Sequence, residues 1–194
     1  MVAEHSTWTA GKSDDLALIS ELPNDLRELI QESGGFILHD GAIHFRGCVL
    51  EPDWNSLREA WRGTNALHLL YPDVYTTDIP FAQDQLGDQY LLRDGSVLRL
   101  EAETGEVALF ANNLQAFTSG IGNSISEYLN VGLGYKLEPG FLLHASPPFC
   151  MAESGVKTSL RPIPIAELIR FHAEVAKQIR DVPDGWKVAF SIQP

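Results

Sequence analysis

The chain has 194 residues and the composition of an ordinary globular protein, with 44% hydrophobic and 21% charged residues. Its net charge of −12 at pH 7 argues against binding to nucleic-acid phosphates, which requires a basic patch. No apolar run approaches the roughly 18 residues of a membrane helix, and the first residues lack the features of a signal peptide. Because Cys48 and Cys150 form no C-x-x-C pair, we expect reduced thiols and a cytoplasmic protein.

The negative charge is concentrated in the first two thirds of the chain. Residues 1–130 hold 20 acidic and 7 basic side chains, a balance of −13. Residues 131–194 hold 6 acidic and 7 basic side chains, a balance of +1. Such a distribution favours a basic protein partner through electrostatic steering, although acidity also serves to keep a protein soluble.

The N-terminal region is predicted to contain an arm and a helix. Residues 1–18 are expected to form a polar arm before a single domain over residues 19–194. The stretch LPNDLRELIQESGG predicts a helix, because Pro23 suits a first turn and apolar residues recur on one face. Gly34 and Gly35 can adopt the left-handed conformation that ends a helix.

The stretch FILHDGAIHF predicts a hairpin with a two-residue turn at Asp40–Gly41. The turn places Leu38 opposite Ile43, on an apolar face that should be buried. The opposite face carries Ile37, His39 and His44. We expect that face to meet solvent and its two histidines to bind no metal, because no third ligand lies beside them.

Two segments rich in aromatic residues follow. EPDWNSLREAWRG predicts a short helix with Trp54, Leu57 and Trp61 on one face. NALHLLYPDVYTTDIPF is expected to form an extended, partly exposed loop, because its prolines disfavour helix.

The stretch GDQYLLRDGSVLRLEAETGEVALF predicts a three-stranded meander with turns at Asp94–Gly95 and Thr104–Gly105. The predicted cross-strand pairs on its leucine-rich face are Leu91 with Leu98, Leu100 with Leu109, and Ala102 with Val107. This face should be buried. On the other face Tyr90 is expected opposite Arg99, and Asp88 opposite Glu101.

The C-terminal region is predicted to contain both helices and strands. Helical segments are expected in NNLQAFTSGIGNSISEYL, followed by a loop-rich stretch with a strand in LEPGFLLHASPPF. PIAELIRFHAEVAKQIR predicts a helix with His172 at the boundary of its apolar face, and WKVAFSI a final strand. The expected fold class is α+β, with one mainly antiparallel sheet built from hairpins and flanked by helices. The expected core residues are Leu26, Ile30, Phe36, Leu38, Ile43, Phe45, Leu91, Leu98, Leu100, Leu109, Leu168 and Trp186.

No pattern predicts a catalytic, metal or cofactor site. Counted as an EF-hand loop from Asp84, the sequence lacks the required Gly and final Glu. If Asp88 and Glu101 lie close together, one carboxyl can have a raised pKa and act as an acid while the other acts as a base. In this alternative the protein is an enzyme. Arg99 lies beside both carboxylates and favours their ionised forms, so we expect no enzyme activity.

The ordered set LPNDLRELIQESGG, Trp61 and IPFAQDQLGDQYLLRDGSVLRLEAETGEV resembles the SUKH superfamily, which includes fungal cell-wall-assembly regulators and bacterial relatives. The resemblance covers about residues 20–130, and residues 131–194 look like an elaboration found in some bacterial members. The residues that match the central motif are Ile79, Pro80, Phe81, Gly87 and Asp88. The resemblance implies an α+β domain without enzyme activity. Many bacterial members are similar to immunity proteins that neutralise a toxin, and fungal members to regulatory scaffolds.

The sequence thus favours a protein-binding module whose partner is a basic toxin domain. We expect it to bind neither nucleic acid nor a membrane. A regulatory scaffold is the alternative. Aromatic rings inside an acidic rim would suit a basic partner, since rings supply affinity and acids speed association. The residues expected at that surface are Trp54, Trp61, Asp73, Tyr75, Asp78, Asp84 and Asp88. A purely structural role for the same residues is the other possibility.

Overall fold

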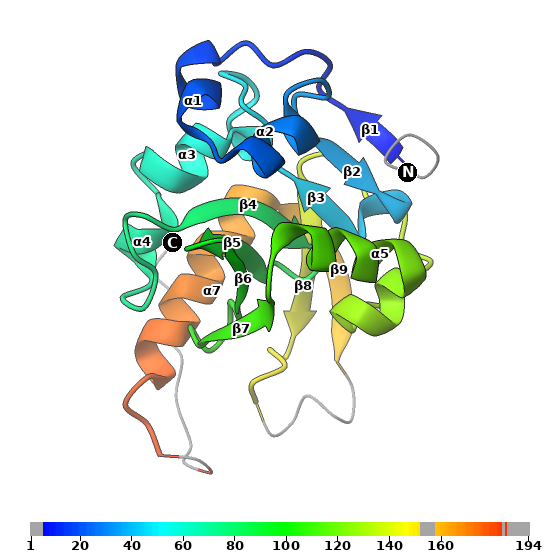
Figure 1. Cartoon of the computed structure of the whole chain (residues 1–194). Helices are drawn as coiled ribbons and strands as arrows, with labels where there is room; N and C mark the ends of the chain where they lie inside the picture. Colours follow the sequence, from blue (N-terminus) through cyan, green and yellow to red (C-terminus); the bar gives the residue numbers. More distant parts are fainter. Residues whose placement is uncertain (1–5, 152–157, 184, 186–194) are drawn as a thin grey trace.

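A seven-stranded antiparallel sheet lies at the centre of the structure, as the α+β prediction requires (Figure 1). The structure is a computed structural model that describes residues 6–151, 158–183 and 185. The seven strands follow one another in chain order: β1 (Ser6–Thr9), β2 (Phe36–Leu38), β3 (Ile43–Phe45), β4 (Ile79–Asp84), β5 (Gln89–Arg93), β6 (Ser96–Leu100) and β7 (Val107–Ala111). A second sheet pairs β8 (Phe141–Ser146) with β9 (Ser159–Pro164).

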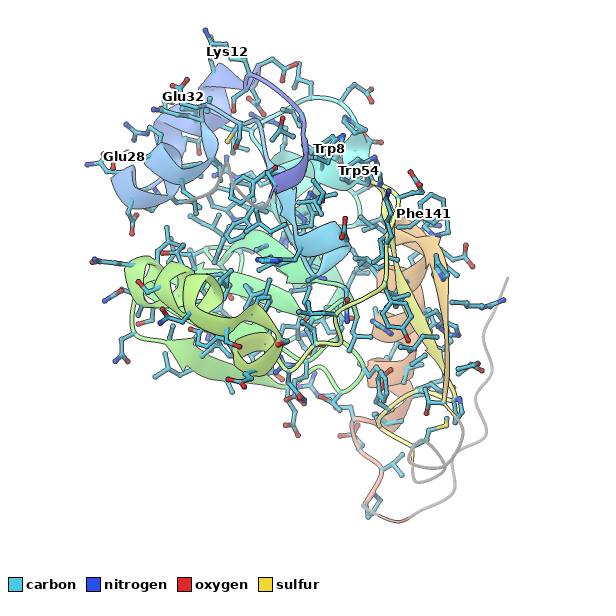
Figure 2. All side chains as sticks on the ribbon, turned by 90° about the vertical axis from the view of Figure 1, so that its right-hand side faces the viewer. Trp8, Lys12, Glu28, Glu32, Trp54 and Phe141 are labelled. Atoms are coloured by element: carbon cyan, nitrogen blue, oxygen red, sulfur yellow. The ribbon has the colours of Figure 1, made fainter. Side chains whose placement is uncertain are left out.

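Helices cover both faces of the large sheet. They are α1 (Leu16–Glu21), α2 (Asn24–Ile30), α3 (Leu57–Arg62), α4 (Leu67–Leu70), α5 (Leu114–Leu129) and α7 (Ile165–Ile179), with short 3₁₀ turns η1 (His39–Gly41) and η2 (Asp53–Asn55). Figure 2 shows α5 on one side of the sheet and α7 on the other. None of the described helices has the length and apolarity needed to cross a bilayer.

Each face of the sheet has its own hydrophobic core. Side chains of α1, α2, α3 and α5 pack around Phe45, Phe81 and Tyr90. On the other face, α4 and α7 pack around Leu91 and Leu100, and α7 also packs against β8 and β9. Of the predicted core residues, those found buried are Leu26, Ile30, Phe36, Leu38, Ile43, Phe45, Leu91, Leu98, Leu100 and Leu168.

The N-terminal segment is part of the fold. Strand β1 pairs with β2 along the edge of the sheet, and α1 buries Leu18 completely. Asp15 caps α1 by accepting a hydrogen bond from the backbone N–H of Leu18 and forms an ion pair with Arg58. The expected boundary after residue 18 therefore falls inside a helix and marks no structural break.

The β2–β3 hairpin has the predicted register, with Leu38 opposite Ile43, but its turn is wider than predicted. Three successive residues have positive φ in place of a two-residue turn, namely His39, Asp40 and Gly41. The backbone N–H of Leu137 donates to the Asp40 carbonyl at 2.9 Å, which holds this turn from a distant segment. The expectation of a solvent face was wrong: Ile37 and His44 are buried.

The predicted register of the meander is confirmed at its first turn and is wrong at its second. Arg93 pairs with Ser96 around Asp94–Gly95, as predicted, whereas Leu109 lies opposite Leu98 and not Leu100. The displacement arises because the second turn spans four residues, Ala102–Gly105, and the Tyr71 hydroxyl donates to the Ala102 carbonyl at 3.0 Å.

Leu109 is 62% exposed, so its predicted place in the core was wrong. It lies on β7, the last strand of the described sheet, where no helix covers it. The face of the meander opposite the leucines is also buried, since Tyr90 and Val97 contact the α5 side of the core.

Two further segments differ from expectation. The supposed loop after Trp61 forms α4 and then β4, with Pro80 inside a strand. In the C-terminal region β8 and α7 are confirmed, whereas β9 was not predicted. The expected strand over residues 186–192, including Trp186, lies outside the described residues.

Candidate functional site

Three of the seven residues expected at the binding surface are buried. The Trp61 indole N–H donates to the Thr76 carbonyl at 2.9 Å, so the ring is part of the core. The Asp78 carboxylate is inaccessible to solvent and accepts two hydrogen bonds from Arg93. Asp84 is 1% exposed. The aromatic and acidic residues in this part of the chain therefore serve mainly to stabilise the fold.

Arg93 brings together the residues of the turn before β4. Its guanidinium lies 3.9 Å from the centre of the exposed Tyr75 ring and donates to the Asp73 carbonyl at 3.0 Å. The Asp73 carboxylate is exposed and forms an ion pair with Arg180 at 3.2 Å. Of the predicted site, only Asp73 and Tyr75 remain on the surface here, and both have partners within the chain.

Asp84 and Asp88 hold the loop between β4 and β5. Asp84 accepts hydrogen bonds from the backbone N–H groups of Leu86 and Asp88, and from the Tyr90 hydroxyl at 3.2 Å. Burial, and then the nearby charge of Asp88, raise the pKa of Asp84 to about 8. The Asp88 carboxylate forms an ion pair with Arg99.

The acid pair on which the enzyme alternative depended does not form. Asp88 directs one oxygen to Arg99 and the other to the backbone N–H of Ala102, at 2.8 Å. Glu101 is exposed to solvent on the neighbouring strand end. The Asp88 carboxylate is thus paired with a cation and a backbone N–H, and no contact with Glu101 is found among the described residues.

Trp54 is half-buried and belongs to an aromatic row. Its ring centre lies 4.9 Å from that of Trp8 and 5.1 Å from that of His44. Figure 2 shows Trp8, Trp54 and the partly exposed Phe141 along one side of the molecule. Trp54 also packs against the hydrophobic cluster formed by β8, β9 and α7, so it connects these elements with the large sheet.

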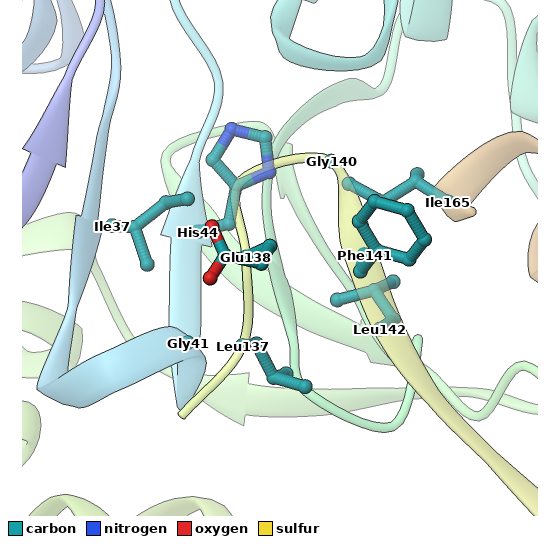
Figure 3. Close-up of a pocket in the computed structure, with 9 residues that line it drawn as sticks. All are labelled: Ile37, Gly41, His44, Leu137, Glu138, Gly140, Phe141, Leu142 and Ile165. Carbon is teal, nitrogen blue, oxygen red and sulfur yellow. The ribbon is translucent and has the colours of Figure 1, made fainter. Parts of the chain in front are cut away.

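A small cavity lies beside this row, between the β2–β3 hairpin and β8 (Figure 3). His44 and Phe141 are among its lining residues, and its volume is about 10 Å³. That volume accommodates at most about one water molecule, so the cavity is too small for a substrate.

A buried polar network fills the interior behind the cavity. The His44 ring is hydrogen-bonded to Asn55 at 2.8 Å and to Gln83 at 3.0 Å. Arg46, 2% exposed, donates to Gln83, to Gln89 and to the carbonyl of Pro80. Burial lowers the pKa of His44 to about 3 and that of Arg46 to about 9. Because protein groups occupy these polar atoms, the network positions β3, β4 and β5 and has no open site.

A second polar group lies near the end of β8. Glu103 accepts a hydrogen bond from the backbone N–H of Cys150 at 2.8 Å, and its other oxygen lies 3.9 Å from His172 Nε2. Burial lowers the pKa of His172 to about 3, so the imidazole is neutral at pH 7. Within the described residues, no three His, Cys, Asp or Glu side chains are placed to hold a metal ion.

The larger hollow is a cleft of about 670 Å³ between α2, the β2–β3 hairpin and α5, which we call the α2–α5 cleft. Its apolar lining consists of Leu29, Phe36, Leu38, Phe45, Ile121, Ile125 and Leu133. Its polar lining consists of His39, Thr118, Asn123, Ser124 and Ser126, with Gly122 between the walls. The volume falls within the range of ligand sites in proteins.

The sequence builds this cleft by interrupting a helix. Residues of α5 are helical on both sides of Ser124, whose φ of −161° and ψ of 91° are not helical. Glycine and asparagine beside it, Gly122 and Asn123, favour such a break. The wall therefore opens at this point, while Ile121 and Ile125 stay on the floor side.

Acidic residues adjoin the lining of the α2–α5 cleft in the sequence, and we call them its rim. Each exposed charged residue next in sequence to a lining residue is an acid: Glu28, Asp40 and Glu127. Glu32, also exposed, lies in the turn that follows α2, whose last residue is Ile30. In Figure 2 the labelled Glu28 projects from α2, which lies above α5, and the labelled Glu32 lies higher in the same view. No sequence motif marks this site, because its walls come from three separate segments.

The cleft offers binding and no evident chemistry. Its described lining contains two serines and one threonine as hydroxyl groups, and one imidazole, His39, on the hairpin turn. No carboxylate or cysteine lines it with them, and a serine nucleophile needs a base held by a third group. An apolar floor with an acidic rim instead matches the layout of a protein interface.

Comparison with known proteins adds no relative to this description. No family model matches the chain, and no curated protein matches its sequence. The SUKH resemblance stays a prediction from the quoted residues, and the α2–α5 cleft is the candidate functional site that this structure offers.

Proposed function

We propose that this protein is a non-enzymatic protein-binding module of the cytoplasm that acts as an immunity protein, binding and neutralising a basic toxin domain. The observation that carries the proposal is the α2–α5 cleft, whose floor is apolar and whose lining residues are adjoined in sequence by the exposed acids Glu28, Asp40 and Glu127. The resemblance of residues 20–130 to the SUKH superfamily supports it, as do the free thiols of Cys48 and Cys150.

The charge distribution favours a partner with a positive charge. Residues 1–130, with a balance of −13 (20 acidic and 7 basic side chains), include every acid on the cleft rim. A basic partner approaches such a surface faster than a neutral one, and the acids deter acidic proteins from docking. The apolar floor would then provide the water-free centre on which affinity depends.

The test is rescue of growth together with direct binding. Candidate toxin domains encoded beside the gene for this chain are expressed in a bacterial host with and without the full chain, and each pair is then measured by biolayer interferometry. We expect growth to be restored and a one-to-one complex in the nanomolar range, with association slowed by added salt. Absence of rescue and of binding for all of them would contradict the proposal. Several weak partners and no tight one would favour the regulatory scaffold.

A further inference from the structure

We infer that the α2–α5 cleft receives an amphipathic α-helix, with apolar side chains on its inward face and Lys or Arg on both flanks. The helix would belong to the partner of the proposed function, on which this inference rests. The structure adds two particulars to that function: the place on this chain where the partner inserts, and the form of the inserted segment.

The floor of the cleft is suited to apolar anchors. Phe36 and Phe45 are stacked with ring centres 4.5 Å apart, and both line the cleft. Leu133 reaches the mouth and is 55% exposed, so an apolar side chain lies unprotected at the entrance. Covering such surface with an apolar side chain removes it from water and favours association.

The sheet at the floor favours a helix over an extended segment. Strand β2 is already bonded to β1 on one edge and to β3 on the other, so it presents side chains and no free edge. A strand laid on this floor would bury backbone N–H and C=O groups without partners, whereas a helix satisfies its own. A helix about 10 Å across fills roughly 420 Å³ per turn, so about 670 Å³ accepts about one and a half turns of inserted material.

The acids are placed for a helix with two basic flanks. Glu28 is exposed on α2, Glu32 in the turn that follows α2, and Glu127 on α5. Lysines or arginines on either side of an apolar stripe would meet these walls while the stripe enters the cleft. Rim pairs of this kind mainly speed association, and the buried stripe slows dissociation.

The experiment uses the full chain and synthetic peptides. The probe is a fluorescein-labelled peptide of about 18 residues, or five helical turns, with Leu at i, i+3, i+4 and i+7 and Lys elsewhere. Two comparison peptides have Glu in place of Lys, or the same Leu and Lys in strict alternation. Affinity is measured by fluorescence anisotropy at physiological salt.

Four variants of the chain locate the binding site. Asn123→Trp fills the mouth, Leu133→Lys makes the entrance polar, and the double variant Glu28→Lys with Glu32→Lys reverses one wall. Their matched control is Glu101→Lys with Glu106→Lys, which makes the same charge change at the exposed turn between β6 and β7. Unchanged thermal midpoints and circular dichroism establish that each variant is folded.

We expect the Leu/Lys helix to bind the wild-type chain, and the three cleft variants to weaken binding by roughly tenfold or more. The control double variant should change affinity by less than about twofold, and both comparison peptides should bind more weakly. Equal weakening by the control would mean diffuse charge attraction and overturn the inference. Unchanged binding to Asn123→Trp and Leu133→Lys would place the site elsewhere, and equal binding of the alternating peptide would refute the helix.

The toxin assay separates this inference from the proposed function. If Asn123→Trp and Leu133→Lys still restore growth and bind the toxin as the wild type does, the cleft is refuted and the immunity function stands. If the peptide binds in the cleft but no toxin is neutralised, the immunity function is refuted and the helix-binding cleft stands.

Discussion

The carboxylate of Asp78 accepts hydrogen bonds from two nitrogens of Arg93, at 2.7 and 2.6 Å, and is completely shielded from solvent. The pair ties the turn before β4 to the end of β5. An acid that the sequence placed on a binding surface is therefore part of the framework, and its removal tests stability.

Asp78→Asn should lower the free energy of unfolding by about 1.5–3 kcal/mol, because it weakens the charge-assisted hydrogen bonds between this buried side chain and Arg93. The matched control is Asp73→Asn, which removes the exposed ion pair with Arg180 and should cost less than about 1 kcal/mol. Urea unfolding followed by circular dichroism measures both. Equal losses in the two variants would show that the Asp78 pair is no more important than a surface pair.

Leu98 and Leu109 lie opposite each other on β6 and β7 but in different environments. Leu98 is buried against α7 and α4, whereas Leu109 is 62% exposed. Leu98→Ala should lower the free energy of unfolding by about 2–5 kcal/mol. Leu109→Ala should change it by no more than about 0.5 kcal/mol. A large loss from Leu109→Ala would mean that β7 is covered in solution.

Asp84 should make stability fall as pH rises. Its folded pKa of about 8 lies above the value of about 3.9 for an unfolded aspartate, so the folded state binds more protons between these values. The contribution of the protonated carboxyl is complete below about pH 4 and is lost as pH rises towards about pH 8. Asp84→Asn keeps an uncharged side chain at all pH values. The difference in unfolding free energy between wild type and variant should therefore shrink with rising pH, and a constant difference would refute the protonated state.

His172 should make stability fall as pH falls. Its folded pKa of about 3 lies below the unfolded value of about 6.5, so the unfolded state binds more protons in that range. Its contribution is present above about pH 6.5 and is lost as pH falls towards about pH 3. His172→Gln should lose less stability than the wild type on acidification. The control is His68→Gln, at a partly exposed position of α4. Identical acid transitions for wild type and His172→Gln would contradict the prediction.

Local patterns in the sequence predicted the elements whose geometry depends on neighbouring residues. The helix after Pro23, the Asp94–Gly95 turn with its register, and α7 are all found, although α2 ends at Ile30, before Gly34 and Gly35. In each, a turn residue with positive φ or a repeat of apolar side chains acts within a few positions of the chain. Such signals do not require knowledge of what covers the element.

The prediction of the binding surface was wrong in part because it depends on contacts between distant segments. Sequence alone does not reveal that Arg93 would cover Asp78, or that Trp54 and Asn55 would lie against His44. Asp88 is likewise paired with Arg99 and with the backbone N–H of Ala102, which lie 11 and 14 residues further along the chain. Whether an acid is solvated or paired depends on residues far along the chain.

The sequence by itself determined the α+β class, most of the core and the acidic sign of the N-terminal two thirds, since these follow from composition and local periodicity. Only the tertiary structure decided where the α2–α5 cleft lies and which acids rim it. Leu29, Phe45, Ile125 and Leu133 meet there from segments up to about a hundred residues apart. Their meeting depends on how α5 packs over the β2–β3 hairpin, and packing of distant segments leaves no periodic trace in the chain.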